Sequence, residues 1–314
     1  MKTALCIPTL NAGADAAILA AAIASQTLQP DAFLVIDSGS DDGTVETFRR
    51  AGARIHSING REFNHGGTRQ IGVDMVSDAD LIIFLTQDAV PADQHAFERL
   101  NEGFNDPGVG VAFGRQLPRL GAGHPEAHAR LFNYPDASRV TTFDDRAAMG
   151  IKTVFLSNSF AAYRRTALLA VGGFPSHLIM GEDTYVAAKM LLAGKKVAYC
   201  AEATVFHSHD YSLMEEFRRY FDAGVLHARE SWIRDHFGGA ENEGLRFVNS
   251  ELRYLLARNP FLIPSAILRT LFKFVGFRLG LQEERLPIAV KRRLSMLRAY
   301  WTDPVAVGNR ASGQ

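Results

Sequence analysis

Short apolar runs alternate with helix-like stretches through the first 90 residues, and this alternation restricts the fold more than any other feature of the sequence. Strands that alternate with helices form crossover units, in which parallel strands carry helices on both faces of one sheet. We therefore predict an α/β fold with a mostly parallel, Rossmann-like sheet flanked by helices. The expected strands are Thr3–Pro8, Phe33–Asp37, Arg54–Ile58 and Leu81–Thr86, and the expected helices are Asp15–Ser25, Thr44–Ala51 and Gly67–Ser77.

Polar clusters follow three of these expected strands, at the point where each strand ends. The clusters are Thr9–Asn11, Asp37–Asp42 and Gln87–Asp88. Because sheets of this kind bind their ligands beyond the carboxyl ends of the strands, we expect the three clusters to form one site.

The rest of the chain is less periodic up to residue 180 and mainly helical from Ser212 onward. The expected elements are a strand at Thr153–Leu156, helices at Arg165–Val171 and Glu182–Ala193, and a strand at Lys196–Cys200. We expect one α/β domain over residues 1–211, whose second half begins at about residue 105. A helical region is expected over residues 212–314.

Composition excludes several classes of protein. The 34 basic and 34 acidic residues balance, which argues against a whole-protein footprint for nucleic acid. Two cysteines, Cys6 and Cys200, exclude a disulfide framework and a Cys-rich zinc site. The absence of an uncharged apolar stretch of about 18 residues predicts that no helix spans a bilayer.

Several side chains have both a structural and a chemical interpretation. Asp88 ends an apolar strand and is either a helix cap or a ligand for a hard divalent cation. His207 and His209 share one face of an extended segment, where either is a potential metal ligand. Asp183 begins a helix, so it is a cap or an ionised base. Arg69 lies in a glycine-rich segment suited to a diphosphate.

The basic residues are concentrated towards the end of the chain. Residues 246–298 carry eleven basic and three acidic side chains. Within them the apolar segment 260–280 contains Arg269 and Lys273, four residues apart. This composition is typical of a helix at an anionic lipid surface. The alternatives are a helix docked on the catalytic core and a dimer interface.

Taken together, the motifs resemble family 2 glycosyltransferases of the GT-A fold. The matching segments are IPTLN at 7–11, DSGSDDGT at 37–44, QDA at 87–89, GGF at 172–174 and GED at 181–183. The segments EFNHGGTRQIG at 62–72 and FHSHDYS at 206–212 resemble, more narrowly, the bacterial rhamnosyltransferases of O-antigen and polysaccharide synthesis.

The resemblance implies a role for each matched residue. Those expected to bind the nucleotide sugar are Thr9, Asn11, Asp37, Ser38, Arg69 and Gln87. Asp88 matches the last acidic residue of the metal-binding DxD motif, and His207, or alternatively His209, completes a Mg²⁺ or Mn²⁺ site. The chain departs from DxD, because Thr86 and Gln87 stand where the first carboxylate would be. Asp183 matches the catalytic base.

The implied reaction is a single displacement with inversion, which moves L-rhamnose from dTDP-β-L-rhamnose to a glycan acceptor on a polyprenyl diphosphate lipid. The expected location is the cytoplasm, peripheral to the inner face of the cytoplasmic membrane, and a homo-oligomer is compatible with the sequence. The alternatives are a UDP-linked galactose, galactofuranose or N-acetylglucosamine donor, and a non-catalytic nucleotide-sugar or glycan-binding protein. A dehydrogenase is disfavoured because no GxGxxG fingerprint is present.

Overall fold

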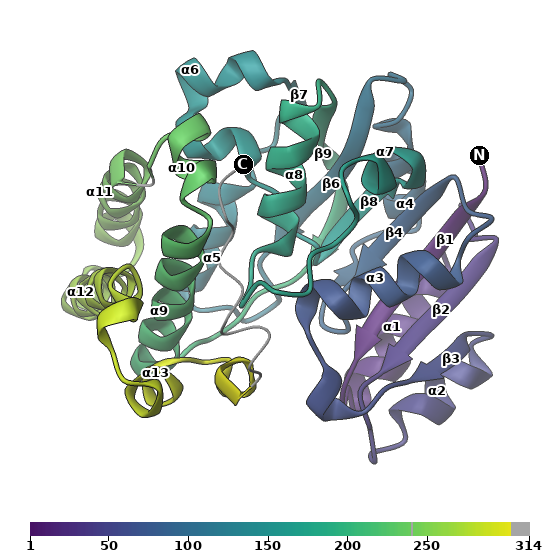
Figure 1. Cartoon of the computed structure of the whole chain (residues 1–314), viewed down its shortest axis with the longest axis horizontal. Helices are drawn as coiled ribbons and strands as arrows, with labels where there is room; N and C mark the ends of the chain where they lie inside the picture. Colours follow the sequence, from purple (N-terminus) through teal and green to yellow (C-terminus); the bar gives the residue numbers. More distant parts are fainter. Residues whose placement is uncertain (240, 303–314) are drawn as a thin grey trace.

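The computed structural model describes residues 1–239 and 241–302, and within them the strands form one nine-stranded sheet (Figure 1). Its order is β3-β2-β1-β4-β8-β6-β9-β5, with β7 paired to β9. The strands are β1 (Thr3–Thr9), β2 (Ala32–Asp37), β3 (Arg54–Ser57), β4 (Leu81–Leu85), β5 (Val90–Pro91), β6 (Val109–Leu117), β7 (Arg139–Thr141), β8 (Phe160–Arg164) and β9 (Lys196–Phe206).

Helices cover both faces of this sheet, as the sequence predicts. The α-helices up to β9 are α1 (Ala14–Ala24), α2 (Thr44–Arg50), α3 (His65–Met75), α4 (Ala96–Glu102), α5 (His124–Asn133), α6 (Arg146–Met149), α7 (Arg165–Ala170) and α8 (Glu182–Leu192). Those after β9 are α9 (Leu213–Arg229), α10 (Ser231–Phe237), α11 (Glu241–Arg258), α12 (Ile263–Gly280) and α13 (Ile288–Leu294). Residues 303–314 of the predicted helical region lie outside the described residues.

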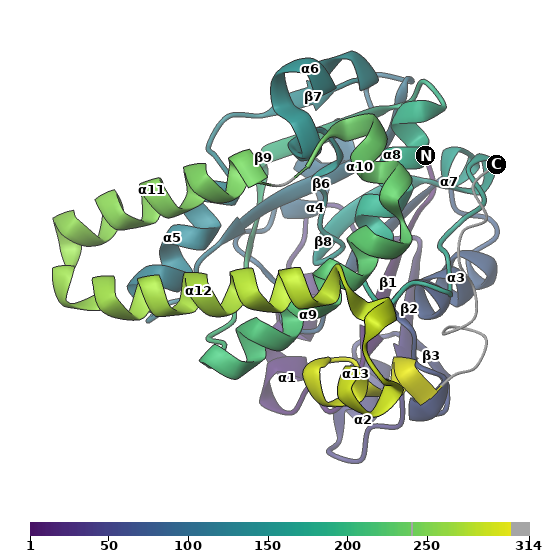
Figure 2. The same cartoon turned by 60° about the vertical axis from the view of Figure 1, so that its left-hand side comes forward.

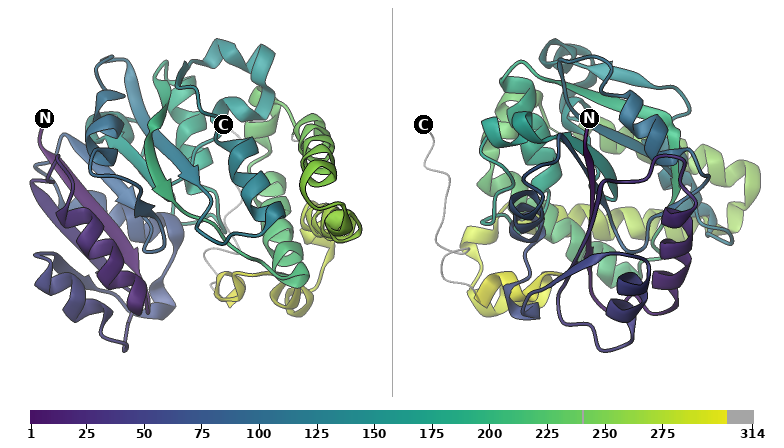
Figure 3. Two further views of the ribbon diagram at one scale, coloured as in Figure 1. Left: turned by 180° about the vertical axis from the view of Figure 1, so that it is seen from behind. Right: turned by 90° about the vertical axis from the view of Figure 1, so that its right-hand side faces the viewer.

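Alternate residues of each strand enter two separate cores, because successive side chains point to opposite faces of a sheet. In β1, Ala4 and Cys6 pack with α3, α7 and α8, whereas Leu5 and Ile7 pack with α1, α2 and α4. Figure 1 shows α3 and α8 in front of the sheet, and the left panel of Figure 3 shows α1 on the opposite face. A third core joins α9 to the residues around Trp301.

The predicted parallel half of the sheet is confirmed, and the second half corrects the sequence prediction. β1 runs parallel to β2 and β4, and β2 runs parallel to β3. β8 enters antiparallel between β4 and β6, and neither β6 nor β8 was expected. The strand predicted at Thr153–Leu156 is wrong, since Gly150–Val154 forms a 3-10 helix. The strand predicted at Lys196–Cys200 continues to Phe206 as β9.

Helix α3 begins earlier than predicted, and the glycine pair Gly66–Gly67 lies inside it. It starts at His65, and the side chain of Asn64 caps it by accepting hydrogen bonds from the Gly66 and Gly67 amides. A Cβ at Gly66 would lie 1.9 Å from the Pro175 carbonyl oxygen, so this position requires glycine because of a close backbone approach.

Candidate active site

The carboxyl ends of β2, β1 and β4 lie side by side, and their polar side chains are bonded to one another. The Thr9 hydroxyl donates to Oε1 of Gln87 over 2.8 Å, and the Leu10 amide donates to the same oxygen over 2.8 Å. Gln87 Nε2 donates in return to the Leu10 carbonyl oxygen over 3.0 Å. The amide of Gln87 therefore fixes the loop that follows β1, a role that a carboxylate, having no donor, would not fill.

The loop after β2 is shaped by Asp37, which is buried. Its Oδ2 accepts hydrogen bonds from the Gly39 amide (3.0 Å) and the Ser40 amide (3.1 Å). Asn11, at a φ of 47°, links the two loops, because its Oδ1 accepts from the Asp41 amide over 3.0 Å. The Ser38 hydroxyl is buried and has no hydrogen-bond partner among the described residues, so it is available to a bound ligand.

Asp88, His207 and His209 form a cluster with metal-ligand chemistry. One ligand atom from each lies within 4.8 Å of the other two. Asp88 Oδ2 lies 3.4 Å from Nε2 of His207 and 3.7 Å from Nε2 of His209. The structure thus brings both histidines that the sequence offers as alternatives to the same carboxylate.

Gln116, at the end of β6, determines which nitrogen of His207 faces Asp88. Its Oε1 accepts a hydrogen bond from Arg130 Nη1 (2.5 Å), and a guanidinium can only donate. His207 Nδ1 lies 2.8 Å from the same oxygen, so Nδ1 carries the proton and donates. In the neutral ring, Nε2 then presents a lone pair towards Asp88.

The electrostatics of the cluster suit a divalent cation. Burial lowers the pKa of His207, and burial followed by repulsion from His207 lowers the pKa of His209 to about 4, so both rings are neutral at pH 7. Burial alone would raise the pKa of Asp88, but in the low pH range where His207 is protonated, its hydrogen bond and charge outweigh burial and lower that pKa, so Asp88 is ionised at pH 7. A carboxylate and two imidazoles, with ligand atoms within 4.8 Å of one another, can together hold a divalent cation.

Asp183 is positioned in the first turn of α8. Its Oδ1 accepts a hydrogen bond from the Thr184 amide (2.7 Å) and its Oδ2 accepts one from the Asn158 amide (3.2 Å). Burial, followed by repulsion from Glu182, raises the pKa of Asp183 to about 6. A carboxylate with this pKa is ionised at pH 7 and still basic enough to take a proton.

The carboxylate of Glu182 is held by two partners, Arg69 and Asn158. It is buried, and its Oε1 lies 3.0 Å from Arg69 Nη1 and accepts from Asn158 Nδ2 over 2.9 Å. Burial would raise the pKa of Glu182, but Arg69, followed by His65, outweighs it and lowers that pKa. The structure places Arg69 in this ion pair beneath the site, so a contact of Arg69 with the donor diphosphate stays a prediction.

The segment 157–159 joins the metal-ligand cluster to Asp183. Gln116 Nε2 donates to the Ser157 hydroxyl over 2.9 Å, and the next residue, Asn158, donates its amide to Asp183. The segment precedes β8, whose Phe160 pairs with Leu85 of β4, three residues before Asp88. Asp88 and Asp183 therefore lie on the same side of the sheet's strands, beyond the carboxyl end of β4. Sequence reasoning missed Gln116, Arg130, Ser157 and Asn158, because their roles depend on contacts between distant segments.

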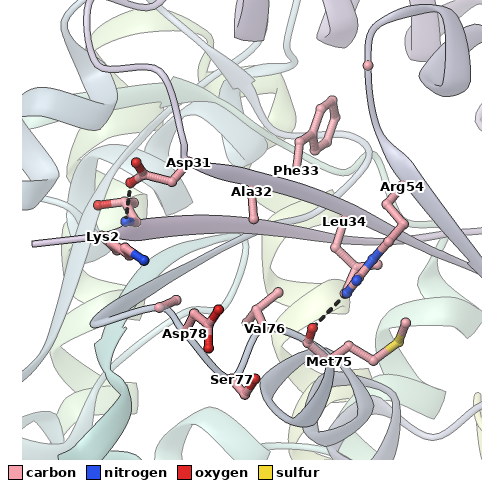
Figure 4. Close-up of a pocket in the computed structure, with 13 residues that line it drawn as sticks. Lys2, Asp31, Ala32, Phe33, Leu34, Arg54, Met75, Val76, Ser77 and Asp78 are labelled. Carbon is pink, nitrogen blue, oxygen red and sulfur yellow. Dashed lines mark hydrogen bonds between the residues drawn. The ribbon is translucent and has the colours of Figure 1, made fainter.

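A cavity of about 620 Å³ opens at the opposite end of the parallel strands (Figure 4). Lys2, Asp31 and Asp78 line it, together with Arg54, which donates a hydrogen bond to the Met75 carbonyl oxygen over 2.6 Å. It lies where β1, β2 and β3 begin, whereas sheets of this type bind ligands where the strands end. We assign it no part in the chemistry.

Known proteins resemble the chain in both sequence and fold. The model of the family described as "Glycosyl transferase family 2" matches residues 4–172. The O-antigen chain rhamnosyltransferase RfbN of Salmonella typhimurium is 50% identical over 304 residues, which are 96% of this chain and 97% of that protein. The O-antigen chain rhamnosyltransferase WbaN of Salmonella anatum is 46% identical over 300 residues, 95% of each chain.

Two solved structures resemble it in fold. The mannosyltransferase PcManGT from Pyrobaculum calidifontis, solved with GDP-Man and Mn²⁺, has a TM-score of 0.56 at 17% identity and covers 99% of this chain and 87% of its own. TarS residues 1–349 of S. aureus has a TM-score of 0.54 at 14% identity and covers 91% of each chain. The predicted GT-A architecture is thereby confirmed, and by its sequence the chain belongs to glycosyl transferase family 2.

Proposed function

We propose that this protein is an O-antigen rhamnosyltransferase, which transfers L-rhamnose from dTDP-β-L-rhamnose to a glycan acceptor. The observation that supports it best is the 50% identity to RfbN over nearly the full length of both chains. The match spans 96% of this chain and 97% of that protein, so the similarity is not confined to one part of either chain.

Asp183 is the proposed catalytic base. It takes the proton of the acceptor hydroxyl while that oxygen forms a bond to the anomeric carbon and the bond from this carbon to the diphosphate oxygen breaks. The neighbouring carboxylate, Glu182, is paired with Arg69 and buried, so it does not serve as a covalent nucleophile. A direct displacement follows, and the configuration inverts to an α-L-rhamnoside.

Asp88, His207 and His209 are the proposed ligands of Mg²⁺ or Mn²⁺. A bound divalent cation supplies positive charge beside the leaving diphosphate. The proposed nucleoside pocket is formed by Thr9, Asn11, Asp37, Ser38 and Gln87. Its proposed polar contacts to the nucleoside are the buried carboxylate of Asp37 and the hydroxyl of Ser38, which has no partner among the described residues.

The acceptor is proposed to be a growing glycan on a polyprenyl diphosphate lipid, used at the inner face of the cytoplasmic membrane. This proposal is supported by the similarity to two O-antigen chain rhamnosyltransferases and by the concentration of basic residues towards the end of the chain.

Donor binding and turnover test the function. Calorimetry with dTDP-rhamnose, UDP-galactose, UDP-galactofuranose and UDP-N-acetylglucosamine should show tight binding of the first alone in the presence of Mn²⁺. Preference for a UDP-sugar would replace the donor assignment. Binding without transfer or donor hydrolysis would identify a non-catalytic protein.

Metal removal is the second test. EDTA should suppress activity, and Mg²⁺ or Mn²⁺ should restore it. Direct Mn²⁺ binding, followed by calorimetry or electron paramagnetic resonance, should be lost in His207→Ala. Activity that is indifferent to EDTA would reject the metal assignment.

A further inference from the structure

Helices α11 and α12 form a hairpin that extends from the rest of the molecule, with the two helices side by side (Figure 2). By length and composition alone, the stretch Pro260–Gly280 is long and apolar enough to cross a membrane, although it carries Arg269, Lys273 and Arg278. Its contacts in the folded protein therefore decide how it could meet a membrane.

One face of α12 packs tightly on α9, through glycines of both helices. A Cβ at Gly276 would lie 2.4 Å from the Phe217 carbonyl oxygen, and one at Gly280 would lie 2.1 Å from the Phe221 carbonyl oxygen. Gly224 of α9 makes the reciprocal approach, 2.3 Å from the Phe277 carbonyl oxygen. Such contacts hold α12 against the catalytic body, so it cannot cross a bilayer without leaving α9.

The two cations in the middle of α12 also face α9. Arg269 Nη1 and Lys273 Nζ lie 3.2 and 3.3 Å from Oε1 of Glu216, and both side chains are largely buried. This corrects the sequence interpretation, in which Arg269 and Lys273 were the residues that meet anionic lipid.

The opposite side of α12 is apolar and exposed, and we call it the α12 face. Phe261 lies in the 3-10 turn just before α12, and the members within α12 are one, three or four residues apart, as on one face of a helix. They are Phe261 (91% exposed), Ile267 (57%), Leu268 (42%), Leu271 (54%), Phe274 (61%) and Val275 (39%). Exposed large apolar side chains in one continuous row mark an interaction surface.

The charge around the α12 face is of one sign. Residues 259–282 contain no aspartate or glutamate. Arg278 continues the row after Phe274, and Arg258 is the last residue of α11, just before the hairpin turn; both are exposed. A second copy of the chain would bring this face against itself, as two-fold interfaces do, and would place arginines together without acidic partners. An anionic lipid surface complements both the apolar row and the arginines.

We propose that the α12 face docks on the surface of an anionic phospholipid bilayer, with α12 lying in the plane of the membrane rather than across it. The apolar row enters the boundary between head groups and acyl chains, and Arg258 and Arg278 meet lipid phosphates. The proposal goes beyond the transferase activity, and its test contains no nucleotide sugar, so either can fail without the other.

Vesicle co-sedimentation of the full chain tests it. The wild type should bind vesicles of phosphatidylglycerol and phosphatidylcholine in equal parts, bind pure phosphatidylcholine much more weakly, and dissociate as salt is added. The variant Phe261→Ser/Leu271→Ser/Phe274→Ser should bind about tenfold more weakly or worse, because three apolar anchors are lost. Arg258→Gln/Arg278→Gln should lose the preference for anionic vesicles.

The matched control removes three exposed apolar side chains elsewhere, Leu120, Val140 and Leu169, which are 97%, 51% and 40% exposed. Leu120→Ser/Val140→Ser/Leu169→Ser should bind vesicles like the wild type, and all variants should unfold at the wild-type temperature. Equal binding of both triple variants, or equal binding of the wild type to neutral and anionic vesicles, would overturn the proposal. The proposal would also be overturned if the wild type did not bind vesicles and light scattering showed that the wild type is a dimer and the α12 variant a monomer.

Discussion

The side-chain oxygen of Gln116 lies 2.8 Å from Nδ1 of His207 and 2.5 Å from Nη1 of Arg130, so one oxygen accepts from both residues. This arrangement leaves Nε2 of His207 as the atom that faces Asp88. A buried amide on β6 therefore orients an imidazole that follows β9, which runs parallel to β6.

We predict that Gln116→Leu weakens Mn²⁺ binding by about 10- to 100-fold, the usual effect of removing a group that orients a metal ligand. Calorimetric titration with Mn²⁺ in the absence of donor is the measurement. Gln26→Leu is the matched control, because Gln26 is similarly buried but bonds to Asp93, in the loop before α4, and to Phe97 of α4. Unchanged Mn²⁺ affinity in Gln116→Leu would show that Gln116 has only a packing role.

Asp183→Asn should lower kcat by about 10²- to 10⁴-fold while the affinity for the donor stays near that of the wild type. In the wild type, kcat/KM should rise with pH up to about 6 and level off above it, because the base works only when ionised and the pKa of Asp183 is raised to about 6. Rate–pH profiles and donor calorimetry measure the two effects. Normal turnover of Asp183→Asn would remove Asp183 from the reaction.

The same substitution should make the protein more stable above pH 6. An unfolded aspartate has a pKa of about 3.9, so raising the folded-state value to about 6 means that ionisation of Asp183 weakens the folded state. The loss of stability begins above the unfolded pKa and is complete above the folded one. Thermal unfolding should show Asp183→Asn above the wild type at pH 8, with no difference near pH 3.5. A lower melting temperature at pH 8 would contradict this.

Arg69→Met should destabilise the fold by about 3–5 kcal/mol, because it leaves the buried carboxylate of Glu182 without its cation. Removing the stranded charge as well, in Arg69→Met/Glu182→Gln, should recover a large part of this loss. Urea unfolding of the two single variants and the double variant forms the cycle. If the double variant is no more stable than Arg69→Met, the ion pair does not support the turn at Asp183.

The first half of the fold was predictable because its elements follow one another in sequence. β1, β2 and β4 are short apolar runs, and the helices between them give the crossover pattern. The second half depends on long-range pairing. β8 lies between β4 and β6, and Leu81 pairs with Arg164, far along the chain. β6 contains Gly110 and Gly114, and glycines weaken the sequence pattern of a strand. The fold nevertheless requires glycine at position 114, because a Cβ there would lie 2.4 Å from the Ala203 carbonyl oxygen of the neighbouring strand.

The candidate site likewise contains residues that could be predicted from the sequence and residues that could not. Asp88, Asp183 and the two histidines have residue types that indicate chemistry, so a motif could suggest them. Gln116 and Asn158 carry no such signal, because an amide gains its role only from the groups that the fold brings to it. The partner of Arg69 was equally invisible, since an arginine in a glycine-rich segment gives no sign that a buried glutamate will face it.

The three residues 157–159 have a consequence for any effort to alter this catalyst. They contact Gln116, which orients a proposed metal ligand, on one side, and Asp183, the proposed base, on the other. A shift of this short stretch would misalign both ends of the reaction at once, and neither end can be retuned there alone. Redesign for a new acceptor should therefore leave it intact.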